Sequence, residues 1–223
     1  ANTGLRVFNS IQHHKLNITR AAFTCSRSPF NYLPAFQADL FLSANPDDVS
    51  VALQHGKASA TLLTGPEYED DDSPEIRIAF DGDAVLFSDE AEIVYKTKGL
   101  EDFTRHEVEK SDVPLMPGPF KGFLEALNRL QTMYQARGEQ PIRIALVTAR
   151  QAPSHKRAIN TLRSWGVTVD EAFFLGGLDK EPILAKFRPH IFFDDQQSYC
   201  LSAAGKVPTG HVPSGIANKQ ECI

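Results

Sequence analysis

The stretch Ile76-Arg-Ile-Ala-Phe-Asp-Gly-Asp-Ala-Val-Leu-Phe-Ser-Asp-Glu90 decides the fold of this chain. Its first part, from Ile76 to Phe80, is a short apolar run that predicts a buried strand. The run ends at Asp81-Gly82-Asp83, and ligands of open α/β sheets bind beyond the carboxyl ends of the strands. Asp-Gly is also a strong hairpin signal, so this stretch alone leaves a binding crevice and a hairpin equally open.

The composition is that of a globular protein. The chain has 223 residues, of which 42% are hydrophobic and 23% charged, enough to bury a full core. A net charge of −5 and the absence of a basic cluster argue against a nucleic-acid surface. No apolar run reaches membrane-spanning length and the start lacks a signal-peptide layout, so a cytoplasmic protein without a membrane partner is expected. The cysteines show no CxxC spacing, which predicts reduced thiols without a metal: Cys25, Cys200 and Cys222.

Strand-like and helix-like segments alternate along the chain, which predicts an α/β fold with a parallel sheet covered on both faces. The other expected strands are Ala21–Thr24, Asp39–Leu42, Ala58–Leu63, Ile142–Val147, Ala172–Leu175, Ile191–Phe193 and a segment near 206–212. The expected helices are Gly4–His14, Asp48–Gln54, Glu90–Glu109 with a break near Gly99, Phe120–Tyr134, Ser154–Trp165 and Pro182–Phe187.

The beginning of the chain matches its end when it is shifted by 157 − 6 = 151 positions, without a gap. Identical pairs are Arg6/Arg157, Asn9/Asn160, Ala21/Ala172, Phe23/Phe174, Leu33/Leu184, Phe36/Phe187 and Phe41/Phe192. Ser43-Ala44 stands where the later copy has Asp194-Asp195, and Pro29 stands opposite Lys180. The repeat keeps packing residues and loses polar ones, which predicts a degenerate partial copy of the same fold half.

Three successive strands of the later part end in polar side chains. These are Asp81 with Asp83, Thr148, and Asp194 with Asp195, and Lys180 precedes the last strand. A hairpin at Asp81-Gly82 does not explain the other strand ends. Converging carboxylates repel each other unless a cation lies among them, and an all-oxygen set suits Mg²⁺ shared with a phosphate.

The same groups suit phosphoryl transfer. A carboxylate at Asp81 can attack phosphorus and form an aspartyl-phosphate. Asp83 can protonate the leaving oxygen and later activate water. Thr148 and Lys180 can hold the equatorial oxygens of the transferred group.

Four motifs resemble, in order, those of the haloacid-dehalogenase-like (HAD) phosphohydrolases: FDGDAVLFSDE, LVTAR, the lysine of GGLDKEP, and PHIFFDD. Their wording is most similar to the cytosolic 5′-nucleotidase type I family, and the likeness extends over FKGFLEALNRLQ and TLRSWGVTVDEAFFLGG. The resemblance implies a three-layer Rossmann-like HAD fold with a small helical cap. It implies Mg²⁺-dependent hydrolysis of nucleoside 5′-monophosphates, with AMP favoured.

The resemblance also implies roles for individual residues. Asp81 is the nucleophile, Asp83 the acid/base, Thr148 and Lys180 the phosphate ligands, and Asp194 and Asp195 the acidic metal pair. Metal ligands are thus expected at Asp81, Asp83, Asp194 and Asp195. Substrate contacts are expected at Thr148, Ala149, Arg150, Lys180, Phe87 and Asp89, the last two with a purely structural role as the alternative. Lys186 is a competitor of Lys180 for the phosphate.

The expected organisation is a partial HAD-like repeat at residues 1–65, an acidic linker at 66–74, and a catalytic domain at 75–223 with a helical cap at about 88–118. The repeat arithmetic, 76 − 151 = −75, and the resemblance both imply a further segment ahead of Ala1. The incomplete copy at residues 1–65 is expected to pack on the catalytic domain, on that upstream segment or on another subunit in a homo-oligomer. Rival hypotheses are a phosphatase or mutase for another phosphate such as a sugar phosphate, a phospho-accepting signalling domain, and a nucleotide-binding pseudoenzyme.

Overall fold

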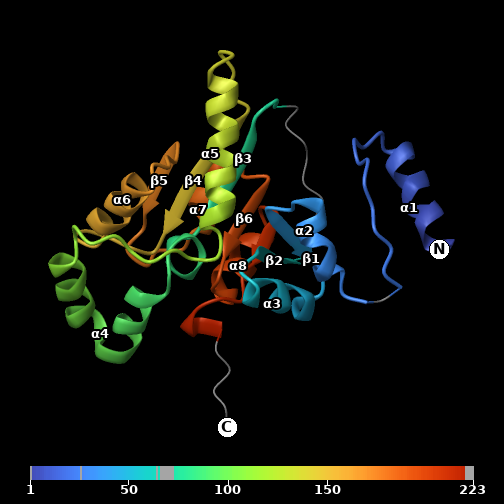
Figure 1. The fold of residues 1–223 in the computed structure, drawn as a ribbon. Helices are drawn as coiled ribbons and strands as arrows, with labels where there is room; N and C mark the ends of the chain where they lie inside the picture. Colours follow the sequence, from blue (N-terminus) through green and yellow to red (C-terminus); the bar gives the residue numbers. More distant parts are fainter. Residues whose placement is uncertain (1, 26, 64, 66–72, 219–223) are drawn as a thin grey trace, which may run out of the picture. The chain divides into compact units, whose positions relative to one another are not determined.

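The computed structural model describes residues 2–25, 27–63, 65 and 73–218, which form two compact units, Ala1–Ala38 and Asp39–Ile223 (Figure 1). Each unit is described by itself. Most of the predicted acidic linker, residues 66–72, lies outside the described residues, as does Cys222.

The first unit contains α1 (Asn2–His13), a 3₁₀ turn (Pro29–Tyr32) and α2 (Leu33–Phe36). Leu5 and Phe8 on α1 are exposed, and Phe8 makes an edge contact with Phe23. The helix expected from Gly4 is confirmed, but the strand expected at Ala21–Thr24 is wrong. The described residues of this unit contain no strand that could pair with Ala21–Thr24, and an unpaired strand would leave its backbone N–H and C=O groups without partners.

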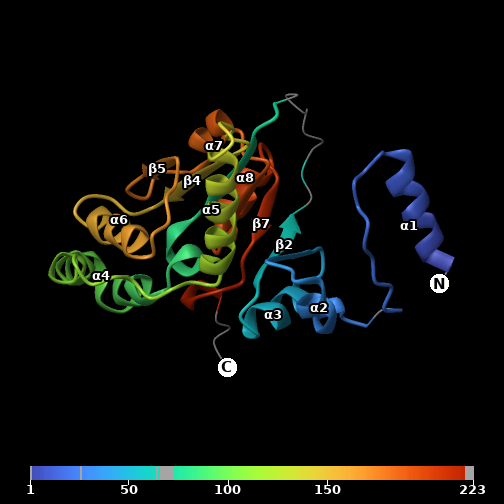
Figure 2. The same cartoon turned by 45° about the horizontal axis from the view of Figure 1, so that its top comes forward.

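The second unit is built on a seven-stranded sheet of order β1-β2-β7-β6-β3-β4-β5 (Figures 1 and 2). Its strands are β1 (Leu40–Ser43), β2 (Ala58–Leu63), β3 (Ile76–Phe80), β4 (Ile142–Thr148), β5 (Glu171–Phe174), β6 (Ile191–Asp194) and β7 (Thr209–His211). Its helices are α3 (Pro46–Gln54), α4 (Glu90–Glu109), α5 (Lys121–Gln135), α6 (His155–Ser164), α7 (Glu181–Phe187) and α8 (Gln197–Ala204), with a 3₁₀ turn at Ile216–Asn218. The predicted α/β class is confirmed, with one departure: β2 and β7 pair antiparallel.

Alternating side chains place the core on both faces of the sheet. Ile78 and Phe80 of β3 join one apolar cluster with α5 and α6, whereas Ala79 between them joins a second cluster with α7 and α8. Phe193 and Phe192 of β6 divide in the same way. This period of two, with apolar residues on both faces, is typical of a parallel strand buried between helix layers.

The predicted repeat reappears in the elements. Adding 151 to the bounds of β1 gives those of β6, and α3 and β2 fall on α8 and β7. Three non-glycine residues of the first copy have positive φ: Lys15, Cys25 and Gln37, each near 52°. Their counterparts Gly166, Gly176 and Arg188 have φ of 67°, 61° and 52°. Because a left-handed backbone is rare outside glycine, three coincident positions favour a true duplication.

The observed units do not follow the boundary expected at residue 65. The pair β1 and β2 is hydrogen-bonded into the same sheet as β3 to β7, through β2 and β7. The compact second unit therefore begins at Asp39, inside the first copy of the repeat. Backbone pairing explains why β1 and β2 belong to the second unit, because backbone groups of β2 hydrogen-bond to β7, a strand of the later copy.

The insert after β3 forms a helical excursion whose base is closed by backbone pairing. Phe87 pairs with Pro117, and the Ser88 amide donates to the Met116 carbonyl at 2.8 Å. A Cβ on Gly118 would lie 2.3 Å from the Phe87 carbonyl oxygen, so a side chain at that position would prevent the closure. Between these residues lies α4, interrupted at Gly99 with φ 84° as the sequence predicted.

Candidate active site

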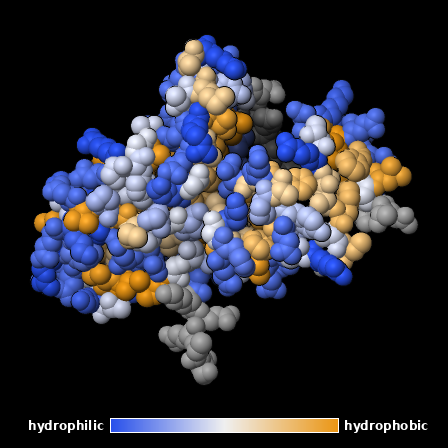
Figure 3. Space-filling view, in the orientation of Figure 1, coloured by the Kyte–Doolittle hydropathy of each residue, from blue (hydrophilic) through white to orange (hydrophobic). Residues whose placement is uncertain are grey.

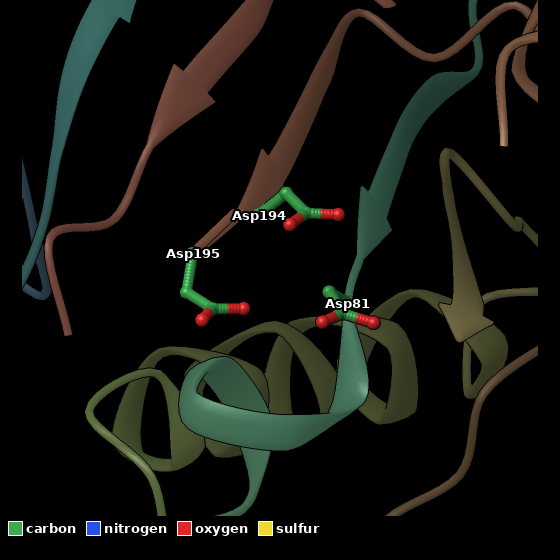
Figure 4. Close-up of side chains that lie close together, drawn as sticks. All are labelled: Asp81, Asp194 and Asp195. Carbon is green, nitrogen blue, oxygen red and sulfur yellow. The ribbon is translucent and has the colours of Figure 1, made fainter. Parts of the chain in front are cut away.

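Three carboxylates converge at the carboxyl ends of two adjacent parallel strands. Asp81 follows β3, Asp194 is the last residue of β6, and Asp195 follows it. The two strands pair in parallel with Phe80 opposite Phe193. One oxygen of each carboxylate lies within 4.8 Å of the others, and all three residues are at most 4% exposed. Figure 4 shows the carboxylates turned toward the same space between the strand ends. The crevice is therefore the correct interpretation of Asp81-Gly82-Asp83, and no hairpin follows β3.

Lys180 is the cation of this cluster. Its Nζ lies 2.7 Å from Asp81 Oδ1 and 2.6 Å from Asp194 Oδ2, and the side chain is 1% exposed. Burial acts to lower the pKa of Lys180, but Asp194 and Asp81 outweigh it, so the pKa is raised and the ammonium stays charged. Lys186, the competitor, is exposed in the last turn of α7.

One cation does not neutralise three buried carboxylates. Burial raises the pKa of Asp81 to about 7, and burial with the charges of Asp81 and Asp194 raises the pKa of Asp195 to about 10. Both Asp195 oxygens are buried and accept no hydrogen bond from the described part of the chain. An orphaned buried carboxylate beside other acids is the arrangement that a hard divalent cation stabilises, so these residues fit the expected Mg²⁺.

Thr148 reaches the same space from the end of β4. It is 1% exposed, and a Cβ on Gly82 would lie 3.2 Å from its hydroxyl oxygen, so glycine lets the Asp81–Asp83 loop approach this strand. The Arg150 amide donates to that hydroxyl at 3.3 Å. The structure thus brings the predicted hydroxyl to the edge that carries the acids.

Asp83 is held by an arginine. Arg150 donates through Nε to Asp83 Oδ2 and through Nη2 to Asp83 Oδ1, both at 2.8 Å. Arg150 is 4% exposed, and Asp83, together with Glu107, raises its pKa above the ordinary value despite burial. The guanidinium expected to contact substrate is therefore already paired with the predicted acid/base.

A cavity of about 480 Å³ extends from these groups to α4. Asp81, Asp83, Thr148, Ala149 and Arg150 line it, as predicted from the motifs. The sequence reasoning missed its other walls: Glu92, Tyr95, Lys96, Leu100, Phe103, Gln151, Gly176, Gly177, Gln196 and Tyr199. Tyr95 and Phe103 sit on α4, which carries no strand-end motif, so the only signal for them was the position of the insert. Tyr199 sits on α8, a helix that the sequence did not predict.

Two predicted substrate contacts lie elsewhere. Phe87 is 0% exposed and packs on Trp165 with ring centroids 5.6 Å apart. Asp89 precedes α4 and adjoins Gly215, outside the cavity wall. Their positions favour the structural alternative, because Phe87 lies inside the core and Asp89 does not line the cavity.

The first copy of the repeat retains the turn but not the acids. Ser43 Oγ accepts from the Asn45 amide at 3.0 Å, as Asp194 Oδ1 accepts from the Gln196 amide at 2.8 Å. Among the described residues, a cluster of side chains with the composition and spacing to hold a metal ion occurs at Asp81, Asp194 and Asp195 and not beside Ser43.

Figure 3 shows apolar side chains at the surface in the region of α4, a helix whose Leu100 and Val108 are exposed. In the described part of the chain, no helix has the length and apolar character needed to cross a membrane.

Comparison with known proteins identifies the family. The 5′-nucleotidase family model matches residues 1–219. Human cytosolic 5′-nucleotidase 1B is 47% identical over 207 residues, which are 91% of this chain and 34% of that protein. The chain therefore spans about a third of the length of this relative, and no solved structure matches it significantly. Because the family model matches nearly the whole length of the chain, the chain belongs to the 5′-nucleotidase family.

Proposed function

We propose that this chain hydrolyses nucleoside 5′-monophosphates to nucleoside and phosphate, with AMP the favoured substrate. The observation that carries the proposal is the buried cluster of Asp81, Asp194 and Asp195 with Lys180 at the strand ends. The family match and the name of the human relative support the substrate class, and that relative's name also supports a cytosolic location.

In the proposed reaction, Asp81 attacks phosphorus and the bond from phosphorus to the nucleoside 5′-oxygen breaks. Asp83 gives its proton to that oxygen, then takes a proton from the water that attacks the aspartyl-phosphate. Phosphate leaves and Asp81 is regenerated. Lys180 and Thr148 stabilise the charge on the transferred group.

Mg²⁺ would be held by Asp81, by Asp194 or Asp195 and by the Asp83 carbonyl oxygen, and it would neutralise negative charge between the acids and the phosphate. The orphaned oxygens of Asp195 support this assignment. The side chains themselves contribute the nucleophile, the proton and the fixed ammonium.

The nucleoside is assigned to the cavity wall formed by α4. Tyr95 and Phe103 meet edge to face with centroids 6.0 Å apart, and Leu100 lies beside them. Half of the Tyr95 surface is exposed, at 51%, so its ring is accessible to a base. Aromatic rings bury a large flat area, which suits a purine.

A phosphate-release screen tests the proposal. Nucleoside 5′-monophosphates and sugar phosphates are each incubated with Mg²⁺ or with excess chelator, and Asp81→Asn serves as the blank. We expect release from nucleotides, strongest from AMP, only with Mg²⁺. Release confined to sugar phosphates, or full release in chelator, would contradict the proposal.

A further inference from the structure

A buried chain of ion pairs links the insert helix to Asp83. Glu107 on α4 is 0% exposed; its Oε2 accepts from Arg150 Nη1 at 2.5 Å and its Oε1 from Arg157 Nη1 at 2.8 Å. Arg157 also donates to Glu90 Oε1 at 2.5 Å and to the Val113 carbonyl at 2.8 Å. Two arginines at 4% and 1% exposure are thus satisfied by carboxylates of the insert.

The break in α4 makes this arrangement possible. Glu90 and Glu107 are 107 − 90 = 17 positions apart, which in a straight helix is about 25 Å. Gly99, at φ 84°, turns the second half back, so that both carboxylates bind Arg157. The two ends of the insert are therefore joined through one guanidinium.

The orientation of Asp83 depends on this network. All three nitrogens of Arg150 are occupied: Nε and Nη2 by Asp83, and Nη1 by Glu107 and the Ser154 carbonyl. A guanidinium is planar, so fixing Nη1 on Glu107 fixes the plane in which the other two nitrogens meet Asp83. Each Asp83 oxygen keeps further acceptor capacity toward the cavity.

We propose that Glu107 is a positioning residue that holds Arg150, and through it the acid/base Asp83, in the orientation needed for proton transfer. The inference rests on the proposed function, because it assigns Asp83 to the proton step. Glu107 itself does not line the cavity, so its effect is expected on turnover and not on substrate binding.

The test uses two substrates that differ in their need for a proton. The leaving group of AMP is adenosine, which departs as an unstable 5′-alkoxide unless it is protonated, whereas p-nitrophenyl phosphate releases p-nitrophenolate, which is stable without a proton. Glu107→Gln should lower kcat/KM for AMP by roughly tenfold to a hundredfold, since an ångström of misplacement has an effect of that size, while KM for AMP stays within about twofold. We expect kcat/KM for p-nitrophenyl phosphate to fall by less than about threefold, because this constant covers only the steps up to departure of the leaving group, before Asp83 acts as a base on water. The ratio of the two kcat/KM values does not depend on how much of the variant is folded.

Glu90→Gln is the matched control, because Glu90 shares Arg157 with Glu107 but does not contact Arg150. It should leave the ratio within about twofold of wild type. When Glu107→Gln is combined with Asp83→Asn, the ratio of the AMP value to the p-nitrophenyl phosphate value should fall no further than in Asp83→Asn alone. Equal losses on both substrates in Glu107→Gln, or additive losses in the double variant, would overturn the proposal.

A crystal structure of Glu107→Gln decides the same point without activity. Asp83 should leave its paired contact with Arg150 in that variant and keep it in Glu90→Gln; an unmoved Asp83 in Glu107→Gln would refute the positioning role. If wild-type protein released no phosphate from any nucleotide, the proposed function would fail. The comparison of the variant structures would still test whether Glu107 positions Arg150 and Asp83.

Discussion

The ammonium of Lys180 lies 2.7 Å from Asp81, the carboxylate proposed as nucleophile. In the first copy of the repeat Pro29 occupies the position of Lys180, and Ser43-Ala44 that of Asp194-Asp195. Duplication has therefore produced one site with charge and one similar framework without it. A framework shared by both copies and chemistry confined to one explain why most identical positions are apolar packing residues, while the acids and the lysine of the site have no counterpart in the first copy.

Asp81→Asn is expected to abolish phosphate release from AMP while leaving the fold intact. The substitution removes the attacking charge and one metal ligand but keeps the size of the side chain. Phosphate release and thermal unfolding measured on the same sample test it. Substantial remaining turnover would end the aspartyl-phosphate mechanism.

Metal binding is expected to depend on Asp195. With its two oxygens unpaired in a buried site, wild-type protein should gain thermal stability on addition of Mg²⁺. Asp195→Asn should lose most of that gain, and calorimetric titration should show at least about tenfold weaker binding. Zn²⁺ binding in a tetrahedral site, or an unchanged Mg²⁺ affinity in the variant, would argue against this assignment.

Tyr95→Ala is expected to weaken nucleotide recognition without removing the chemistry. Loss of the exposed ring should raise KM for AMP by roughly fivefold to tenfold, an effect of about 1 kcal/mol, with kcat little changed. The KM for p-nitrophenyl phosphate, which has no base, serves as the internal control. A fall in kcat alone would indicate that Tyr95 acts in the reaction itself and does not bind the adenine base.

The two copies of the repeat allow a paired stability measurement. Phe192→Ala should destabilise by about 3–5 kcal/mol, because that ring is fully buried. Phe41 at the equivalent position is only partly buried, so Phe41→Ala should lower the free energy of unfolding by a smaller amount. Urea unfolding of both variants checks this, and an equal loss would show that Phe41 is buried in solution.

Restoring the acids in the first copy is expected to gain nothing. Ser43→Asp combined with Ala44→Asp recreates the acidic pair, but Pro29 supplies no ammonium there. With Asp81→Asn as background, the phosphate-release assay should remain at the level of the blank. A phosphate or Mg²⁺ seated beside residue 43 in a crystal structure would overturn the structural assignment of this copy.

The stabilising effect of Glu107 is expected to vanish in acid. Burial acts to raise the pKa of Glu107, but Arg150 and Arg157 lower it below its ordinary value of 4.5. A group with a depressed folded pKa contributes stability above its unfolded pKa and loses it as the pH falls through the folded value. The difference in unfolding free energy between wild type and Glu107→Gln should therefore be constant near pH 6–7 and shrink below about pH 4.5. Urea unfolding across this range tests it; a difference that grows on acidification would reverse the sign.

The sequence by itself determined the sheet and the strand-end chemistry. Apolar runs such as Ile142–Val147 and Ile191–Phe193 predicted β4 and β6, because a strand covered on both faces must be apolar throughout. Acids and a hydroxyl directly after those runs predicted a shared site, because the carboxyl ends of parallel strands lie at one edge. The gapless shift of 151 predicted the equivalence of β1 and β6, since the spacing of packing residues records the order of the elements.

Only the tertiary structure decided the surroundings of that site. Gly99 was readable as a break, but the folding back of α4 depends on the long-range ion pairs that Glu90 and Glu107 each form with Arg157. Phe87 looked available for substrate, yet it is buried against Trp165, because burial is set by residues far away in the chain. The helix Gln197–Ala204 was missed and the strand at Ala21–Thr24 was wrong, since short segments adopt the structure that their neighbours can pair with or cover.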